Sequence, residues 1–140
     1  MTNRIFVDSN IWIYAFSEDE DPRGAAARSF IAGAPNENTL VTSYQVVNEV
    51  TIILKKHGYS EPDLRRIIAG MFDICELYNF SQNGAMLASE LRETLSVSYW
   101  DSHIAASAIL ADCDVLASED FQDGSLLRGV RVKNIFKPNP

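Results

Sequence analysis

Two acidic residues follow short apolar segments of the sequence, at places where a side chain could do chemistry. Asp8 comes directly after Ile5-Phe6-Val7, and Asp120 comes shortly after Val115-Leu116-Ala117. Such short apolar runs, bounded by polar residues, are typical of buried strands. Because ligands of open parallel sheets bind beyond the carboxyl ends of the strands, we expect both carboxylates to lie at a binding site.

Two further acids could face the same crevice. Asp101 lies in the first turn of a helix expected to begin at Ser98, and Glu49 precedes Val50 on an otherwise apolar helix face. Carboxylates that lie within a few ångströms of one another raise each other's pKa, and a divalent cation relieves this repulsion. Ligation by oxygen alone favours Mg²⁺ or Mn²⁺ over zinc, and such ions commonly act on phosphate substrates. The four acids therefore predict a site for a hard metal ion.

The elements that must position these acids alternate between short strands and helices. Strands are expected at 5–7, 40–41, 75–80 and 115–117, with a further edge strand at 130–132. Helices are expected at 24–32, 44–57, from 60 onward, at 83–95 and from 98 through 109. This alternation predicts a three-layer α/β/α fold with a mainly parallel sheet.

Length and composition limit the class of protein. The chain has 140 residues, of which 46% are hydrophobic, so one domain over residues 1–140 with its own core is expected. No apolar stretch approaches the roughly 18 residues of a membrane-spanning helix, and the N-terminal run is too short for a signal peptide, so we expect a cytoplasmic protein. Cys75 and Cys113 form no CxxC pair and are expected to be reduced thiols in the core.

The net charge is unfavourable for general binding of nucleic acid. With 19 acidic and 12 basic residues the chain carries a charge of −7, which repels phosphate polymers at long range. Any nucleic acid must therefore be held by local features of the surface. The basic cluster Arg128, Arg131, Lys133 and Lys137 either contacts phosphates or forms a solvated edge, and the sequence favours neither.

Four segments carry a resemblance to a known family. They are FVDSNIWIYA at 6–15, SYQVVNEV at 43–50, YWDSHIAA at 99–106 and LASEDF at 116–121. In this order, and over almost the whole chain, they resemble the PIN-domain family. Among its members the sequence looks most like the VapC-type toxins, the ribonuclease halves of bacterial and archaeal toxin–antitoxin pairs.

The resemblance implies a fold, a reaction and partners. The fold would be a parallel sheet of about five strands between helices, and the reaction would be Mg²⁺- or Mn²⁺-dependent hydrolysis of RNA by water. The partners would be the RNA substrate, a second copy in a homodimer and a cognate antitoxin that covers the acidic crevice. The metal-binding and catalytic acids would be Asp8, Glu49, Asp101 and Asp120, with Asn10 and Ser118 as polar supports.

Simpler interpretations exist for the same residues. Asp8 and Asp101 could merely cap helices, Glu49 could face solvent, and Asp120 could be an ordinary loop acid. Glu119 and Asp123 compete with Asp120 for the place of the fourth acid. Three further groups receive no catalytic role: His57 is expected at a helix end, His103 in packing or at the surface, and Trp12, Tyr14 and Phe16 in the core or an oligomer contact.

Two other functions fit parts of the pattern. A strand ending in Asp8-Ser9-Asn10 looks like the start of a haloacid-dehalogenase-type phosphatase, with Asp8 as the nucleophile. That chemistry needs a general acid two residues later, where this chain has Asn10, and a lysine that the sequence does not identify. The second alternative is a binding module that keeps the fold without catalysis.

Overall fold

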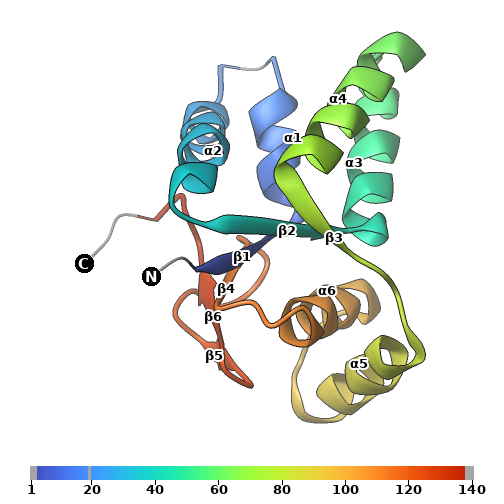
Figure 1. Ribbon diagram of the computed structural model, residues 1–140, viewed down its shortest axis with the longest axis vertical. Coiled ribbons are helices and arrows are strands. Elements are labelled where there is room, and N and C mark those ends of the chain that lie inside the picture. The colour runs from blue at the N-terminus through green and yellow to red at the C-terminus, as the bar shows by residue number, and fades with distance from the viewer. Residues whose placement is uncertain (1–2, 19, 138–140) are drawn as a thin grey trace.

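A six-stranded sheet runs through the middle of the molecule, and helices cover both of its faces (Figure 1). The computed structural model describes residues 3–18 and 20–137. All neighbouring strands are parallel except the last pair, which is antiparallel. In spatial order the strands are β3 (Cys75–Tyr78), β2 (Thr39–Ser43), β1 (Arg4–Val7), β4 (Val115–Ala117), β6 (Val130–Lys133) and β5 (Leu126–Leu127).

The central strand β1 explains why the apolar runs in the sequence are continuous rather than alternating. Phe6 and Val7 are fully buried, because helices lie on both sides of a parallel sheet. Ile5 is in register with Leu40 of β2 and with Val115 of β4. Just beyond β1, the backbone N–H of Asp8 donates to the carbonyl of Ala117 at 3.0 Å. The ends of β1 and β4 are thereby held side by side.

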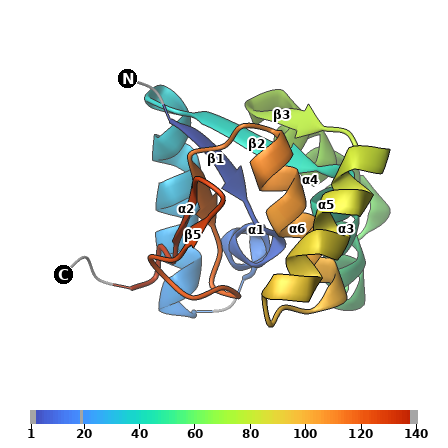
Figure 2. The same cartoon turned by 90° about the horizontal axis from the view of Figure 1, so that it is seen from below.

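The helices form the two outer layers, as Figures 1 and 2 show from perpendicular directions. One layer contains α1 (Ser9–Phe16), α2 (Pro22–Gly33), α3 (Tyr44–Lys56) and α4 (Glu61–Ile74). The other contains α5 (Gln82–Thr94) and α6 (Tyr99–Leu110), and the short 3-10 helix η1 (Ala34–Asn36) leads from α2 toward β2. The predicted three-layer α/β/α fold with a mainly parallel sheet is confirmed. No helix of the described ranges is long and apolar enough to cross a membrane.

Serine caps fix where four of the helices begin. The side chains of Ser43, Ser60, Ser81 and Ser98 each accept a hydrogen bond from the backbone N–H three residues later. Such caps satisfy one of the amide groups that lack a partner in the first turn. The cap at Ser98 matters for the site, because the amide that it binds belongs to Asp101 at 3.1 Å.

The helix α1 was not predicted from the sequence. Its residues Ile11, Trp12, Ile13 and Tyr14 are β-branched or aromatic and favour strands in isolation. Tertiary contacts override this preference: Ile11 and Trp12 are buried in the core, and the side chain of Asp8 caps the helix.

The sheet also has one strand more than the expected five, and residues 130–133 do not lie at its edge. Arg128 and Gly129 both have positive φ values, of 46° and 93°, and form a two-residue hairpin turn. The turn folds the two-residue strand β5 back onto β6, so that β5 is the edge strand. A strand of two residues gives no periodicity that a sequence pattern could reveal.

Both cysteines are free, as expected. Cys113 is buried and Cys75 half-buried, and burial raises the pKa of each thiol to about 12.

Candidate active site

Asp8 lies at the carboxyl end of β1 and is almost fully buried, with 2% of its surface exposed. Its Oδ1 accepts a hydrogen bond from the backbone N–H of Ser9 at 2.7 Å, as the N-cap of α1. Its Oδ2 accepts from the hydroxyl of Ser118 at 2.7 Å, just after β4. Asp8 is therefore a helix cap, as the simpler interpretation held, and it is also fixed at the end of the central strand.

The surroundings of Asp8 oppose a negative charge. Burial raises its pKa to about 7, while the hydrogen bonds from Ser118 and Ser9 lower it and the charges of Asp120 and Glu49 raise it further. A nearby cation would stabilise the anion of such a buried carboxylate further.

Glu49 reaches the site from the middle of α3 and is half-buried. Its Oε2 accepts from the hydroxyl of Ser9 at 2.7 Å, and its Oε1 accepts from the amide of Gln45, one turn earlier, at 2.8 Å. The same Gln45 amide donates to the carbonyl of Trp100 at 3.2 Å and so links α3 to the start of α6. Glu49 does not simply face solvent.

Asp101 lies in the first turn of α6 and is also half-buried. Burial is the main cause that raises its pKa, followed by the charge of Asp120 and, more weakly, that of Glu49, and a hydrogen bond with Ser98 acts in the opposite direction. Asp101 also lines the same groove as Glu49 and Ser9, so it lies on the same side of the molecule as these residues.

Asp120 is exposed in the loop after β4, and two polar side chains orient it. The amide of Asn10 donates to its Oδ2 at 3.0 Å, and its own backbone N–H donates to the hydroxyl oxygen of Ser118 at 3.0 Å. The Ser118 hydroxyl thus connects Asp120 to Asp8. Asn10 and Ser118 both contact the acids that the resemblance assigned them to support.

The rivals of Asp120 point elsewhere. Glu119 accepts a hydrogen bond from the phenol of Tyr14 at 2.6 Å and lies 3.8 Å from the guanidinium of Arg23. Asp123 accepts from the backbone N–H of Asn134 at 2.8 Å. The geometry groups Asp120, and not these two residues, with Asp8 and Asp101.

The donor set fits a hard divalent cation in its chemistry, although its side chains do not yet converge. Within 3–18 and 20–137, no three His, Cys, Asp or Glu side chains are placed to hold one ion as they stand. The carboxylates are instead bound to neutral donors from Ser9, Asn10, Gln45 and Ser118. Among the described residues, none donates a hydrogen bond to the buried Oδ1 of Asn10, which leaves it available to accept from a water molecule on a hydrated ion.

A groove of about 1060 Å³ begins at the acids and continues between α3 and α6. Ser9, Glu49 and Asp101 line one end of it, and apolar and aromatic side chains line the rest: Ile13, Ile52, Ile53, Phe80, Tyr99, Trp100 and His103. We call it the aromatic groove. None of its exposed rings was predicted from the sequence to form a binding surface.

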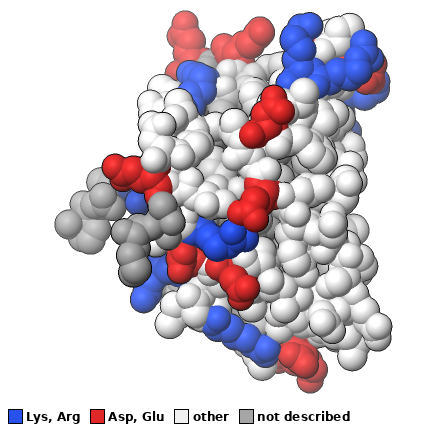
Figure 3. All heavy atoms as spheres, in the orientation of Figure 1, with Lys and Arg blue, Asp and Glu red and all other residues white. Residues whose placement is uncertain are grey.

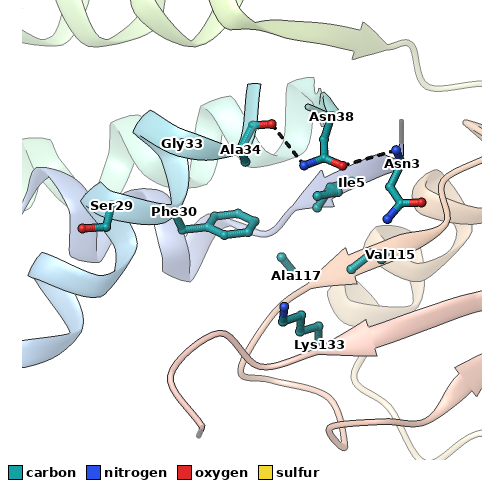
Figure 4. A pocket seen from close by; sticks show the side chains of 10 residues that line it. All are labelled: Asn3, Ile5, Ser29, Phe30, Gly33, Ala34, Asn38, Val115, Ala117 and Lys133. Atoms are coloured by element: carbon teal, nitrogen blue, oxygen red, sulfur yellow. Dashed lines mark hydrogen bonds between the residues drawn. The ribbon is translucent and has the colours of Figure 1, made fainter. Parts of the chain in front are cut away.

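A second hollow, of about 390 Å³, contains none of the four acids (Figure 4). Phe30 projects from α2 over Ile5 and Ala117 of the sheet, with Lys133 at the margin. Asn38 closes one end, because its side chain donates to the carbonyl of Ala34 and accepts from the backbone N–H of Asn3. This hollow offers no group of ionisable residues for chemistry.

Ser9 and Gln45 are polar residues of the site that were not predicted from the sequence. Ser9 stands between Asp8 and Glu49, and Gln45 stands one helical turn before Glu49. The spacing of Gln45 and Glu49, at positions i and i+4 of one helix, is the signal that could have identified their pairing.

Comparison with known proteins adds three structures of similar fold. VapC20 of Mycobacterium tuberculosis, described as a toxin that cleaves the sarcin–ricin loop, is 18% identical, with a TM-score of 0.69 over 84% of this chain and 91% of that one. A chain of VapBC2 from Rickettsia felis, bound to a DNA fragment of its promoter, is 18% identical, with a TM-score of 0.66 over 94% of this chain and 98% of that one. A chain of a toxin–antitoxin complex from Klebsiella pneumoniae is 24% identical, with a TM-score of 0.68 over 90% and 94% of the two chains.

At these identities the likenesses establish the fold alone. No curated protein matches the sequence significantly. The model of the PIN domain, however, matches residues 5–122, which contain all four acids, most of β1 and the whole of β2, β3 and β4. The chain belongs to the PIN domain family.

Proposed function

We propose that this protein is a metal-dependent endoribonuclease of the VapC type, the toxin component of a type II toxin–antitoxin pair. The observation that carries the proposal is the grouping of Asp8, Glu49, Asp101 and Asp120, from four separate segments, at the carboxyl edge of the sheet of a PIN domain. Nucleases of this family generally use divalent metal ions. The cleavage of an RNA loop by the similar VapC20 supports the choice of RNA as the substrate.

In this proposal Asp8 and Asp101 are the principal ligands of Mg²⁺ or Mn²⁺, with Glu49 and Asp120 beside them. The bound ion would stabilise charge on the phosphoryl oxygens and lower the pKa of the attacking water, so no side-chain nucleophile is needed. Ser118 and Ser9 hold the carboxylates of Asp8 and Glu49 through their hydroxyl groups. Binding requires the carboxylates to exchange some of these neutral donors for the ion.

The same proposal includes the partners. A cognate antitoxin would cover the acidic crevice, and two copies of the chain would form a homodimer. Support comes from the toxin–antitoxin complexes of Rickettsia felis and Klebsiella pneumoniae, which contain chains of the same fold.

The phosphatase alternative loses its support. Both oxygens of Asp8 accept hydrogen bonds, and Asn10, which stands where the general acid would be needed, binds Asp120 instead. Membership of the PIN domain family also accounts for the segment on which that alternative rested. The non-catalytic binding module stays as the outcome to be tested against cleavage.

The proposal is tested with Asp8→Asn and Asp101→Asn, assayed on single-stranded and hairpin RNA with Mg²⁺, Mn²⁺ or EDTA. We expect either substitution, or EDTA, to lower cleavage by at least about a hundredfold, because loss of metal-ion stabilisation removes several kcal/mol from the transition state. Asp123→Asn is the matched control, since this carboxylate binds only the backbone of Asn134 among the contacts described.

Circular dichroism shows whether each variant is folded. Cleavage that persists in folded Asp8→Asn or Asp101→Asn protein would reject the assignment of the site. A wild-type chain that neither cleaves RNA nor gains thermal stability from Mg²⁺ or Mn²⁺ would favour the binding module.

A further inference from the structure

The aromatic groove exposes an unusual amount of apolar surface next to the acids. Four of its side chains are more than half exposed: Phe80 at 69%, Trp100 at 62%, Tyr99 at 54% and Ile52 at 53%. A contiguous exposed apolar surface of this kind marks a place where something binds. On the face seen in Figure 3, the area at the lower right, where α5 and α6 lie, carries little charge.

The rings form a connected cluster around one buried polar group. Tyr99 and Trp100 meet at right angles with centroids 5.1 Å apart, and the ring of His103 lies 4.7 Å from Tyr99 and 6.0 Å from both Trp100 and Phe80. His103 is only 8% exposed, and none of the described groups forms a hydrogen bond with its Nε2. An unpaired buried nitrogen is destabilising, and a polar ligand that displaces the neighbouring rings slightly would supply its missing partner.

The chemistry of the groove favours a nucleobase over an aliphatic side chain. A leucine or valine of a protein partner would cover the rings but leave Nε2 of His103 without a partner. A base offers both a flat face that stacks on an aromatic ring and an edge with hydrogen-bonding groups.

The charges along the groove agree with a nucleotide chain. The lining includes two acids, Glu49 and Asp101, both at the end where the scissile phosphate would lie, and one cation, Lys56. Lys56 follows Glu49 by seven residues on α3, so it lies about 10 Å farther along the helix. A phosphate near Lys56 and a second one near the acids would place the base between them against the rings.

We propose that the aromatic groove binds a nucleobase of single-stranded RNA next to the phosphate held at the acids, with the base stacked on Trp100 or Phe80 and its edge toward His103. The presence of RNA in this groove rests on the proposed nuclease function. The rings would then select unpaired nucleotides, because a base within a duplex cannot present its face to them.

The test is a cycle that combines variants of the groove with altered RNA. Binding of a fluorescein-labelled single-stranded RNA of about eight nucleotides is measured by fluorescence anisotropy for the full chain, a length within the range of such sites. Ca²⁺ replaces Mg²⁺, because it also takes oxygen ligands, and a gel confirms that the RNA stays intact. The second set of RNAs has one abasic residue at each position in turn.

We expect Trp100→Ala and Phe80→Ala to weaken binding of the intact RNA by at least about tenfold, which matches the loss of one stacked base. At one position, replacing the nucleotide by an abasic residue should weaken binding to the wild type by about tenfold. The same replacement should change the affinity of Trp100→Ala only slightly, because that variant has already lost the stacking contact. His103→Phe keeps an aromatic ring at this position but removes Nε2, so the affinities for RNAs with each of the four bases at that position should differ less than they do for the wild type. Leu126→Ala is the matched control, because Leu126 is 58% exposed on β5 and does not line the groove.

Several outcomes would overturn the proposal. Equal affinities for wild type and Trp100→Ala, or independent losses from the variant and the abasic residue at every position, exclude stacking in the groove. Light scattering gives the oligomeric state in parallel. If Trp100→Ala or Phe80→Ala turns a dimer into monomers while RNA affinity per chain is unchanged, the groove is an interface between copies and not a base site.

The two proposals fail in different ways. If the wild type cleaves RNA but the cycle shows no coupling between the rings and a base, only the groove is wrongly assigned. If coupling is present but no metal ion supports cleavage, the groove binds a base and the nuclease assignment is wrong.

Discussion

At the scale of single residues, the site depends on how strongly its surroundings stabilise the ionised form of Asp8. The carboxyl group is buried at the end of the central strand, and the hydroxyl of Ser118 and the amide of Ser9 stabilise its anion only in part. Its pKa therefore rises from the ordinary 3.8 to about 7, and the negative charges of Asp120 and Glu49 contribute to that rise. Metal binding and protonation compete for the same group.

This competition predicts a dependence of stability on pH. Because the pKa of Asp8 is higher in the folded than in the unfolded chain, the folded chain binds the proton more tightly, and stability falls as the pH rises from about 4 to about 7. The contribution amounts to up to about 4 kcal/mol of unfolding free energy in the absence of metal. Urea unfolding of wild type and Asp8→Asn at several pH values measures it, and the variant should lose less stability than the wild type over this range.

Stabilisation by a metal ion should have the opposite dependence on pH. Mn²⁺ should raise the melting temperature of the wild type more at pH 8 than at pH 5, because protons occupy Asp8 at the lower pH. Asp123→Asn should behave like the wild type in both experiments. Equal pH dependence in wild type and Asp8→Asn would show that other groups govern the effect.

Tyr14 is a residue that positions Asp120 without touching it. Its phenol has a pKa raised to about 12 by burial and by Glu119, so it stays protonated and donates to Glu119 at 2.6 Å. Arg23 donates to the Tyr14 oxygen at 2.7 Å and lies over its ring. These contacts fix the residue next to Asp120 against α1 and α2.

We expect Tyr14→Phe to lower the unfolding free energy by about 1 kcal/mol, the cost of one such hydrogen bond. It should also weaken Mn²⁺ binding several-fold in a titration followed by calorimetry, because the loop that carries Asp120 loses one of its attachments. Tyr78→Phe is the control, since its hydroxyl contacts Ser81 near the start of α5. Similar losses of metal affinity in both variants would refute a specific role for Tyr14.

At the scale of elements, α6 combines packing with positioning. Its small residues Ala105, Ala106 and Ala108 are buried, which allows the helix to approach its neighbours closely. Arg92 of α5 donates to the hydroxyl of Ser102 at 2.8 Å and so anchors the first turn. The start of α6, where Asp101 lies, is therefore held both by its cap and by α5.

Removal of the cap should affect the site as well as stability. Ser98→Ala is expected to cost about 1 kcal/mol of unfolding free energy and to weaken metal-dependent cleavage, because the first turn that carries Asp101 loses its hydrogen bond. Ser60→Ala removes the same kind of cap from α4, which carries no residue of the site. Denaturant titrations should show similar costs for both, with reduced cleavage for Ser98→Ala only. Equal cleavage by the two variants would separate the cap from the function.

At the scale of the whole molecule, a chain with a net charge of −7 is proposed to bind a polyanion. The basic cluster on the last hairpin does not simply offer its charges to RNA, since Arg128 pairs with Glu90 at 3.3 Å and Arg131 donates to the carbonyl of Gly124 at 2.8 Å. Acidic and basic side chains are interspersed on the face seen in Figure 3. The RNA would then be held by the metal site and the aromatic groove rather than by a basic surface.

This arrangement predicts a weak dependence of RNA affinity on salt. Between about 50 and 200 mM salt the affinity should fall less than about tenfold, whereas a protein that makes many phosphate contacts loses a thousandfold or more. Lys56→Gln should flatten the dependence further, and Lys55→Gln should not, because Lys55 pairs with Glu61. Anisotropy titrations at several salt concentrations measure both effects. A steep dependence that survives Lys56→Gln would point to a basic surface elsewhere.

Local patterns in the sequence were sufficient to predict the alternation of strands and helices, the parallel sheet and the positions of Asp8 and Asp101 at the ends of elements. These features follow from local signals, namely continuous apolar runs, serine caps and the glycine that ends α3. The strand-favouring residues of α1 gave the opposite signal, and β5 was too short to give one.

Two features could not be predicted from the sequence, namely which acid of the last loop is linked to Asp8 and where the aromatic rings gather. Glu119, Asp120 and Asp123 are equivalent candidates in the sequence. Their side chains differ in their hydrogen-bond partners, which are Tyr14, Asn10 and Asn134 respectively and lie more than ten residues away in the chain. Phe80 and Trp100 line the same groove only because the fold places α6 beside α3 and the start of α5. Local patterns specify which elements form, but the direction of a side chain in a loop is fixed by contacts between distant segments.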